Sequence, residues 1–71
     1  MESVTIITRD VNGKRNTHYL RWDSVCKYVE NNKEHLVDDE ILMISVDGQC
    51  VYSGLWTVDL LTWEEVTGFF G

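Results

Sequence analysis

The sequence predicts a small single domain of the α+β class over residues 1–71, in which two hairpins form a mainly antiparallel sheet and helices pack on one of its faces. Three observations predict this fold. Asn-Gly and Asp-Gly, both strong hairpin signals, each follow a run rich in β-branched residues. The apolar spacing changes to that of an amphipathic helix from Trp22 onward, and a helix-start signature lies near the C-terminal end.

The first hairpin is expected to turn at Asn12-Gly13, because both residues tolerate positive φ and so suit a two-residue type I′ loop. The segment from Ser3 to Arg9 before it is rich in Val, Ile and Thr, which favour strands. This loop pairs Asp10 with Arg15, Thr8 with Thr17 and Ile6 with Tyr19. The pattern predicts strands near residues 3–10 and 15–21.

An amphipathic helix follows the first hairpin. Its apolar stripe is formed by Trp22, Val25, Val29, Asn32 and Leu36, with charged residues mostly elsewhere. Asp23 is the expected N-cap, because a short carboxylate accepts hydrogen bonds from the free N–H groups at a helix start. The helix should end near Asn32–His35.

Asp47-Gly48 predicts the second hairpin. A two-residue loop there pairs Val46 with Gln49, Ile44 with Val51 and Met43 with Tyr52. Residues 41–46 carry apolar side chains on both faces, which indicates a central, covered strand. Gly54 should form a bulge or turn, and the alternation of Trp56, Val58 and Leu60 suggests a short further extended segment.

The last helix has the clearest start, because Thr62-Trp63-Glu64-Glu65 matches a capping box, with Leu61 and Val66 placed as its hydrophobic staple. Trp63, Val66 and Phe70 share one face of this helix. About two turns cannot bury every aromatic residue on one side, so we expect Phe69 or Trp63 to be partly exposed.

Length and composition exclude several classes of protein. With 71 residues, the chain is too short for a catalytic cleft between two lobes, and its longest apolar runs do not approach the length of a membrane span. The first five residues do not resemble a secretory signal, which predicts a cytoplasmic protein. Cys26 and Cys50 lack the spacing of a redox or disulfide pair, so both are expected to be reduced residues of the core.

Charge is segregated along the chain. Residues 1–33 hold six basic and four acidic residues (+2), residues 34–71 hold eight acidic residues and no Lys or Arg (−8), and the sum is the net charge of −6. An acidic half of this kind suits a partner protein with a basic surface. Direct nucleic-acid binding is disfavoured, since Arg9, Lys14 and Arg15 form the only basic cluster. A plain solubilising role for the charge is the alternative.

Catalytic and metal-binding patterns are weak. Cys26 with His18 or His35 could be a nucleophile and its base, but a thiol beside the apolar helix stripe is poorly reactive. Asp38-Asp39-Glu40 is expected to be a solvated linker rather than a hard-cation site, and the cysteines and histidines lack zinc-ligand spacing. We therefore expect no enzymatic activity, no cofactor and no metal.

No residue pattern assigns a family. In size, acidity and lack of catalytic groups, the chain is similar to the small inhibitor or decoy proteins that phages and mobile elements encode. The first hypothesis is a non-enzymatic binding module that blocks a basic, nucleic-acid-handling protein. The expected partner-binding residues are Asp38, Asp39, Glu40, Glu64, Glu65, Trp56, Trp63 and Phe69. The alternative is a homodimeric structural or assembly protein that uses its aromatic C-terminal segment or an open sheet edge; a small-molecule-binding domain is weaker, because so short a chain leaves little room for a pocket.

Overall fold

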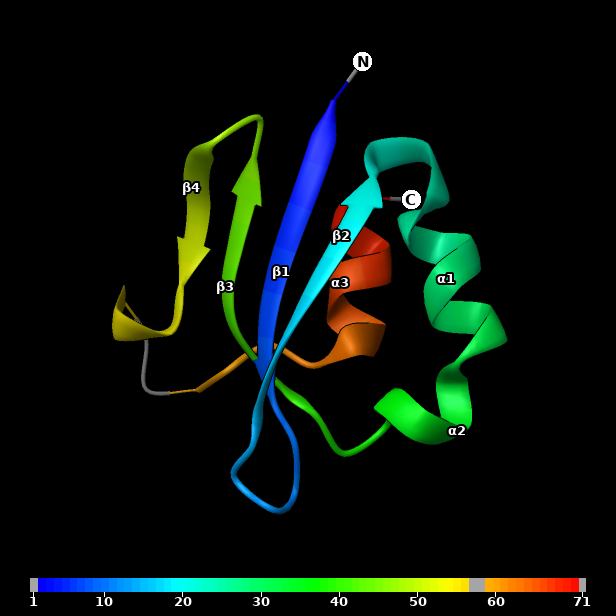
Figure 1. Cartoon of the computed structure of the whole chain (residues 1–71), viewed down its shortest axis with the longest axis vertical. Coiled ribbons are helices and arrows are strands. Elements are labelled where there is room, and N and C mark those ends of the chain that lie inside the picture. The colour runs from blue at the N-terminus through cyan, green and yellow to red at the C-terminus, as the bar shows by residue number, and fades with distance from the viewer. Residues whose placement is uncertain (1, 57–58, 71) are drawn as a thin grey trace.

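A computed structural model describes residues 2–56 and 59–70, and it confirms the α+β fold class (Figure 1). The elements are β1 (Ser3–Arg9), β2 (Arg15–Arg21), the 3₁₀ helix η1 (Trp22–Ser24), α1 (Val25–Asn31), α2 (Lys33–Leu36), β3 (Glu40–Val46), β4 (Gln49–Ser53), the 3₁₀ helix η2 (Gly54–Trp56) and α3 (Trp63–Phe70). The strands form one antiparallel sheet in the order β2-β1-β3-β4. The helices pack against one of its faces.

The first hairpin forms where it was expected, but its predicted register is wrong by one residue. Asp10 causes the shift: its Oδ1 accepts hydrogen bonds from the N–H groups of Asn12 (2.9 Å) and Lys14 (3.0 Å), and its carbonyl accepts one from Gly13 (2.9 Å). Gly13 alone adopts positive φ (+80°), whereas a type I′ loop would also require it of Asn12. The loop is therefore one residue longer and ends in a glycine bulge.

This shift reverses the face on which the β2 side chains lie. Ile6 is opposite His18, and Tyr19 is opposite Thr5 rather than Ile6. His18 consequently faces the core, and Tyr19, expected as an apolar partner of Ile6, is 80% exposed on the other face of the sheet.

The second hairpin has the predicted loop, with positive φ at Asp47 (+49°) and Gly48 (+83°) and Val46 opposite Gln49. Beyond that pair a bulge shifts the register, so the other two predicted pairs are wrong. Ile44 lies opposite Tyr52, and Met43 opposite Ser53. The bulge admits Val51 as an additional residue in β4.

β3 is a central strand between β1 and β4, as predicted, although only one of its faces is fully covered. Ile41 and Ile44 are buried beneath the helices, whereas Leu42 and Met43 are half-buried on the other face. Gly54 begins η2, so the chain turns there. The predicted extended segment is wrong at Trp56, which belongs to η2, and residues 57 and 58 lie outside the described residues. Leu61, just after this segment, forms a single bridge with Ile41.

The middle helix is interrupted at Asn32, where φ is −118° and ψ is 20°. The Nδ2 of this residue donates a hydrogen bond to the carbonyl of Tyr28 (2.8 Å), which competes with a regular helical turn. The predicted N-cap is wrong, since Asp23 lies within η1. Ser24 stabilises this turn instead: its Oγ accepts a hydrogen bond from the N–H of Arg21 (3.2 Å) and donates one to the carbonyl of Arg21 (3.0 Å).

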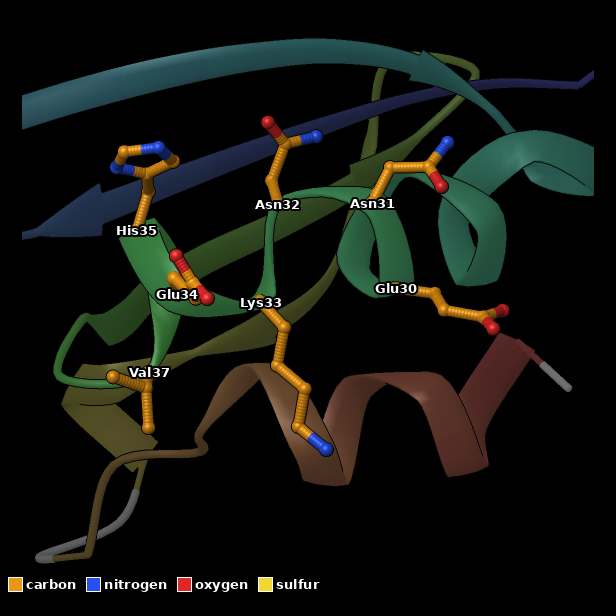
Figure 2. A pocket seen from close by; sticks show the side chains of 7 residues that line it. All are labelled: Glu30, Asn31, Asn32, Lys33, Glu34, His35 and Val37. Carbon is orange, nitrogen blue, oxygen red and sulfur yellow. The ribbon is translucent and has the colours of Figure 1, made fainter.

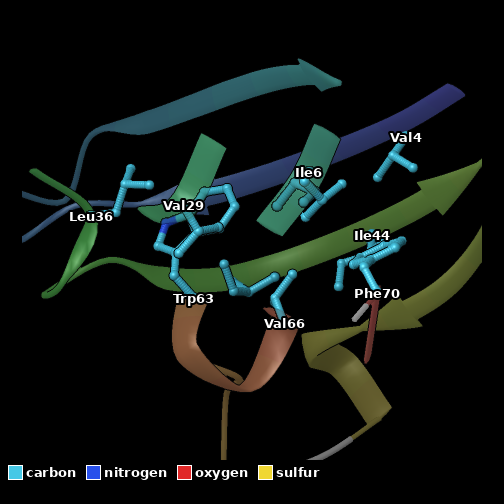
Figure 3. Close-up of a cluster of buried hydrophobic side chains, with 10 residues drawn as sticks. Val4, Ile6, Val29, Leu36, Ile44, Trp63, Val66 and Phe70 are labelled. Carbon is cyan, nitrogen blue, oxygen red and sulfur yellow. The ribbon is translucent and has the colours of Figure 1, made fainter. Parts of the chain in front are cut away.

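The core lies between the sheet and the helices (Figure 3). Its buried apolar residues are Val4, Ile6, Val25, Val29, Leu36, Ile41, Ile44, Trp63, Val66 and Phe70. The capping box of α3 is confirmed: Thr62 N donates to Glu65 Oε1 (3.2 Å) and Glu65 N donates to Thr62 Oγ1 (3.4 Å). Trp63 is buried and Phe69 is 54% exposed, which decides between the two aromatics predicted to reach the surface.

The two cysteines are both free, but their environments differ. Cys26 is half-buried, and its thiol donates to the carbonyl of Thr67 (3.4 Å). Cys50 is exposed, so the expectation that it belongs to the core is wrong. The register of β4 explains its position, because Cys50 lies opposite Ser45 on the face of the sheet away from the helices.

Candidate functional site

Five acidic residues are exposed on the helical layer of the folded chain. Glu30, Glu34, Asp38, Glu64 and Glu65 are all exposed on the helical layer, from the end of α1 through α2 to the first turn of α3. We call this set the acidic surface. Lys33 is the basic residue among them. The four-residue helix α2 connects both ends of this surface. Its first residue, Lys33, and the residue that follows the helix, Val37, line one hollow with Glu30 and Glu34 and a second hollow with Glu64.

The break at Asn32 shapes the first hollow (Figure 2). Asn32 ends one helical segment, and α2 starts again at Lys33 in a new direction, so the side chains along 30–37 spread apart. In Figure 2 the Lys33 side chain points toward α3, and that of Asn32 points the opposite way. The exposed side chain of Val37 is the apolar residue that lines this hollow, at the end opposite Glu30 (Figure 2).

The carboxylates of the acidic surface form no ion pair with a basic group of the described residues. Within residues 2–56 and 59–70, one ion pair is present, between Arg9 Nη2 and Glu40 Oε1 at 3.0 Å. Glu64 and Glu65 are placed in the first turn of α3, where the helix dipole favours negative charge. Glu65 is also held by its hydrogen bonds with Thr62.

The structure does not bring together all of the residues predicted to bind a partner. Asp39, expected in a solvated linker, is only 8% exposed, and its Oδ2 accepts a hydrogen bond from the buried Trp63 Nε1 (3.4 Å). Glu40 is paired with Arg9 on β1. Three of the predicted acids are exposed: Asp38 in the turn after α2, and Glu64 and Glu65 in the first turn of α3.

The predicted aromatic residues also separate. Trp63 belongs to the core, and the side chain of Trp56 lies outside the described part of the structure. Phe69 is exposed in the last turn of α3, with its ring centroid 6.4 Å from that of Trp22. Phe69 is therefore at the end of α3 opposite the acidic residues.

A polar cluster around His18 was not predicted from the sequence. One ring nitrogen of His18 lies 3.1 Å from Thr8 Oγ1, and the other lies 2.9 Å from the hydroxyl of Tyr28. Its ring packs edge-on against Trp63, with centroids 5.0 Å apart. Burial lowers the pKa of His18, and the negative charge of Asp39 partly opposes that effect. The correct β2 register, which places His18 opposite Ile6, was the signal needed to find this cluster.

This cluster does not form the nucleophile and base considered from the sequence. The ring nitrogens of His18 contact Thr8 and Tyr28, whereas the Cys26 thiol donates to Thr67. Over the described ranges, no three His, Cys, Asp or Glu side chains come close enough together to hold a metal ion.

Comparison of the chain with protein-family models, curated proteins and solved structures found no match. In the part of the chain that the structure describes, none of the helices has the length and apolar character needed to cross a membrane.

Proposed function

We propose that this protein is a non-enzymatic binding module whose acidic surface occupies the basic surface of a nucleic-acid-handling protein, as an inhibitor or decoy. The observation that carries the proposal is that Glu30, Glu34, Asp38, Glu64 and Glu65 are all exposed on the helical layer and form no ion pair with any residue that the structure describes. Solubility alone would not require the negative charge to gather on one layer.

The physical basis is electrostatic steering. A surface of one sign attracts a complementary surface before contact and raises the association rate, most strongly at low salt. Exposed Val37 lines the same hollow as Glu30 and Glu34, and it offers an interface an apolar contact that excludes water. The surface therefore combines several carboxylates with one exposed apolar side chain.

A paired set of charge variants tests the proposal. Asp38→Asn/Glu64→Gln removes two charges from the acidic surface, and the control Glu2→Gln/Asp23→Asn removes two exposed charges elsewhere. Each immobilised chain captures proteins from a lysate of the source cells, and the captured partner is then purified for titration. We expect the first variant to weaken binding of that partner at least tenfold, about 1.4 kcal/mol, and the control to change it less than twofold.

The decoy mechanism adds a second requirement. A purified partner should lose its nucleic-acid binding when the wild-type chain is added, because both ligands would use the same basic surface. An equal loss of affinity in both double variants would show that net charge matters and the acidic surface does not.

Phe69 supports a second candidate function, self-association of a structural or assembly protein. An exposed aromatic residue next to Trp22 provides an apolar contact suited to a second copy of the chain. Sedimentation equilibrium of the wild type and Phe69→Ser separates the two functions. A dimer that dissociates in the variant would favour assembly, and a monomer in both would leave the binding module as the better explanation.

A further inference from the structure

A shallow groove crosses the face of the sheet that the helices leave open. Its floor is formed by Ile7 of β1 and by Leu42 and Met43 of β3, and η2 borders one end. Leu60 lines the groove at the same end, beside Gly54. We call this feature the sheet groove. It lies on the opposite side of the sheet from the packed core, so the fold does not need it for burial.

Two arginines line the other end of the sheet groove. The observed register places Arg9 of β1 directly opposite Arg15 of β2, and both line the groove. Like charges directly opposite each other in a sheet are destabilising. Glu40 neutralises Arg9 at 3.0 Å, which leaves Arg15 with no ion-pair partner among the described residues. The groove therefore keeps one positive charge next to an apolar floor at a cost to the hairpin.

Leu55 adds an apolar anchor at the η2 end. This side chain is 94% exposed although it is fully apolar, and it lines the groove together with Leu60. The sheet groove thus offers aliphatic contacts at one end and a guanidinium at the other. A complementary ligand carries an anionic group next to aliphatic side chains.

We propose that the sheet groove binds an extended peptide segment of a partner protein, in which an acidic side chain contacts Arg15 and neighbouring aliphatic side chains cover Ile7, Met43 and Leu55. Charge complementarity selects the acidic residue, and the open shape of the groove favours a peptide. A fatty acid would need a pocket that encloses its chain. Single-stranded nucleic acid would need aromatic side chains for stacking, and the described residues that line the groove include none.

This site is independent of the acidic surface, because it lies on the opposite face and attracts the opposite charge. Its test uses a fluorescein-labelled peptide that alternates leucine and glutamate, titrated with the full chain and followed by fluorescence anisotropy. A peptide that alternates leucine and lysine and one that alternates serine and glutamate are the comparison probes. We expect the leucine-glutamate peptide to bind at least tenfold more tightly than either.

Variants then locate the site. Arg15→Gln should weaken binding of the leucine-glutamate peptide at least fivefold, and Leu55→Ser at least threefold. Arg21→Gln, on the same strand and face but outside the groove lining, should leave the affinity unchanged. Arg15→Gln should also retain or raise the melting temperature, because it removes the opposed positive charge. A melting temperature that does not fall, together with weaker peptide binding, would show that Arg15 has a role in binding and not in stability.

Four results would overturn the proposal. The first two are equal binding of the three peptides and an equal loss of peptide affinity in Arg15→Gln and Arg21→Gln. The other two are tighter binding of decanoate or oligothymidine than of the leucine-glutamate peptide, and a concentration-dependent dimer that Arg15→Gln abolishes. The last would make a second copy of this chain the occupant. None of these results would bear on the role proposed for the acidic surface. Asp38→Asn/Glu64→Gln changes that surface and not the sheet groove, so this variant should bind the leucine-glutamate peptide as the wild type does.

Discussion

His18 connects three elements through its side chain, since it lies on β2 and contacts Thr8 of β1, Tyr28 of α1 and Trp63 of α3. Its two hydrogen-bonding partners are hydroxyl groups, which can donate to a neutral ring or accept from it. Burial disfavours the charged ring, whereas Asp39 favours it, and the lowered pKa shows that burial has the larger effect.

This lowered pKa predicts that stability falls in mildly acidic solution. In the folded chain the pKa of His18 lies below its ordinary value of 6.5, so the unfolded chain binds this proton more tightly than the folded chain does. The contribution of His18 is thus complete above about pH 6.5 and is lost as the pH falls through the lowered folded-state pKa. Urea unfolding from pH 5 to 8 should show this loss in the wild type and a weaker one in His18→Asn. The control His35→Asn, which alters an exposed histidine of α2, should behave as the wild type.

Asp39 and Asp38 are adjacent in sequence but should respond differently to substitution. Asp39→Ala removes the acceptor for the buried Trp63 indole and should lower the free energy of unfolding by about 1–3 kcal/mol. Asp38→Ala alters an exposed side chain and should change it by less than about 0.5 kcal/mol. Denaturant titration of both variants checks this difference. Equal, small effects would mean that Asp39 is not a structural residue.

The cysteines should label at different rates in the native protein. Exposed Cys50 should react rapidly with a thiol reagent, and Cys26 should react slowly until the chain unfolds. The number of rapidly modified thiols by mass spectrometry should be one in the wild type and none in Cys50→Ser. Rapid labelling of Cys50→Ser would place Cys26 at the surface and reopen a reactive role for it.

Among the elements, a local signal predicted the structure correctly where it was compatible with one conformation, and failed where it was compatible with two. The capping box of α3 and the Asp47-Gly48 loop depend on neighbouring residues, and both formed as predicted. The register of the first hairpin depended on one Asp10 side chain that accepts two backbone hydrogen bonds. Asn-Gly is compatible with both a two-residue and a three-residue loop, so sequence alone did not choose between them.

The hairpin glycines give a test of these turns. Gly13 and Gly48 both have positive φ, and a Cβ added at either would meet no atom within 4 Å, so the cost of a side chain is conformational. Gly13→Val or Gly48→Val should lower the free energy of unfolding by about 1–3 kcal/mol, and Gly13→Asn by much less, because Asn tolerates this region. Gly68→Ala, in open space within α3, should instead stabilise by about 0.5–1 kcal/mol. If thermal unfolding showed the same loss of stability for Gly13→Val as for Gly13→Asn, the turn described here would be wrong.

The fold redistributes the acidic residues that are adjacent in sequence, because some are exposed on the helical layer and others are buried or paired. Charge counting along the chain identified the acidic half, and Asp38, Glu64 and Glu65 are indeed exposed on the helical layer. Charge counting could not show that Asp39 is buried or that Glu40 forms an ion pair. The buried Asp39 carboxylate accepts a hydrogen bond from Trp63, which is 24 residues away, and Glu40 pairs with Arg9 on the neighbouring strand. The sheet groove was equally hidden, since it requires the register that opposes Arg9 and Arg15.

The dependence of the association rate on salt tests the proposed role of the acidic surface most directly. The rate constant for binding the purified partner should fall steeply between 0.1 M and 1 M salt, where the Debye length shortens from about 10 Å to about 3 Å. Asp38→Asn/Glu64→Gln should bind more slowly at low salt and show a shallower dependence, whereas Glu2→Gln/Asp23→Asn should follow the wild type. Identical salt dependences for the wild type and Asp38→Asn/Glu64→Gln, with both proteins folded, would contradict the role proposed for this surface.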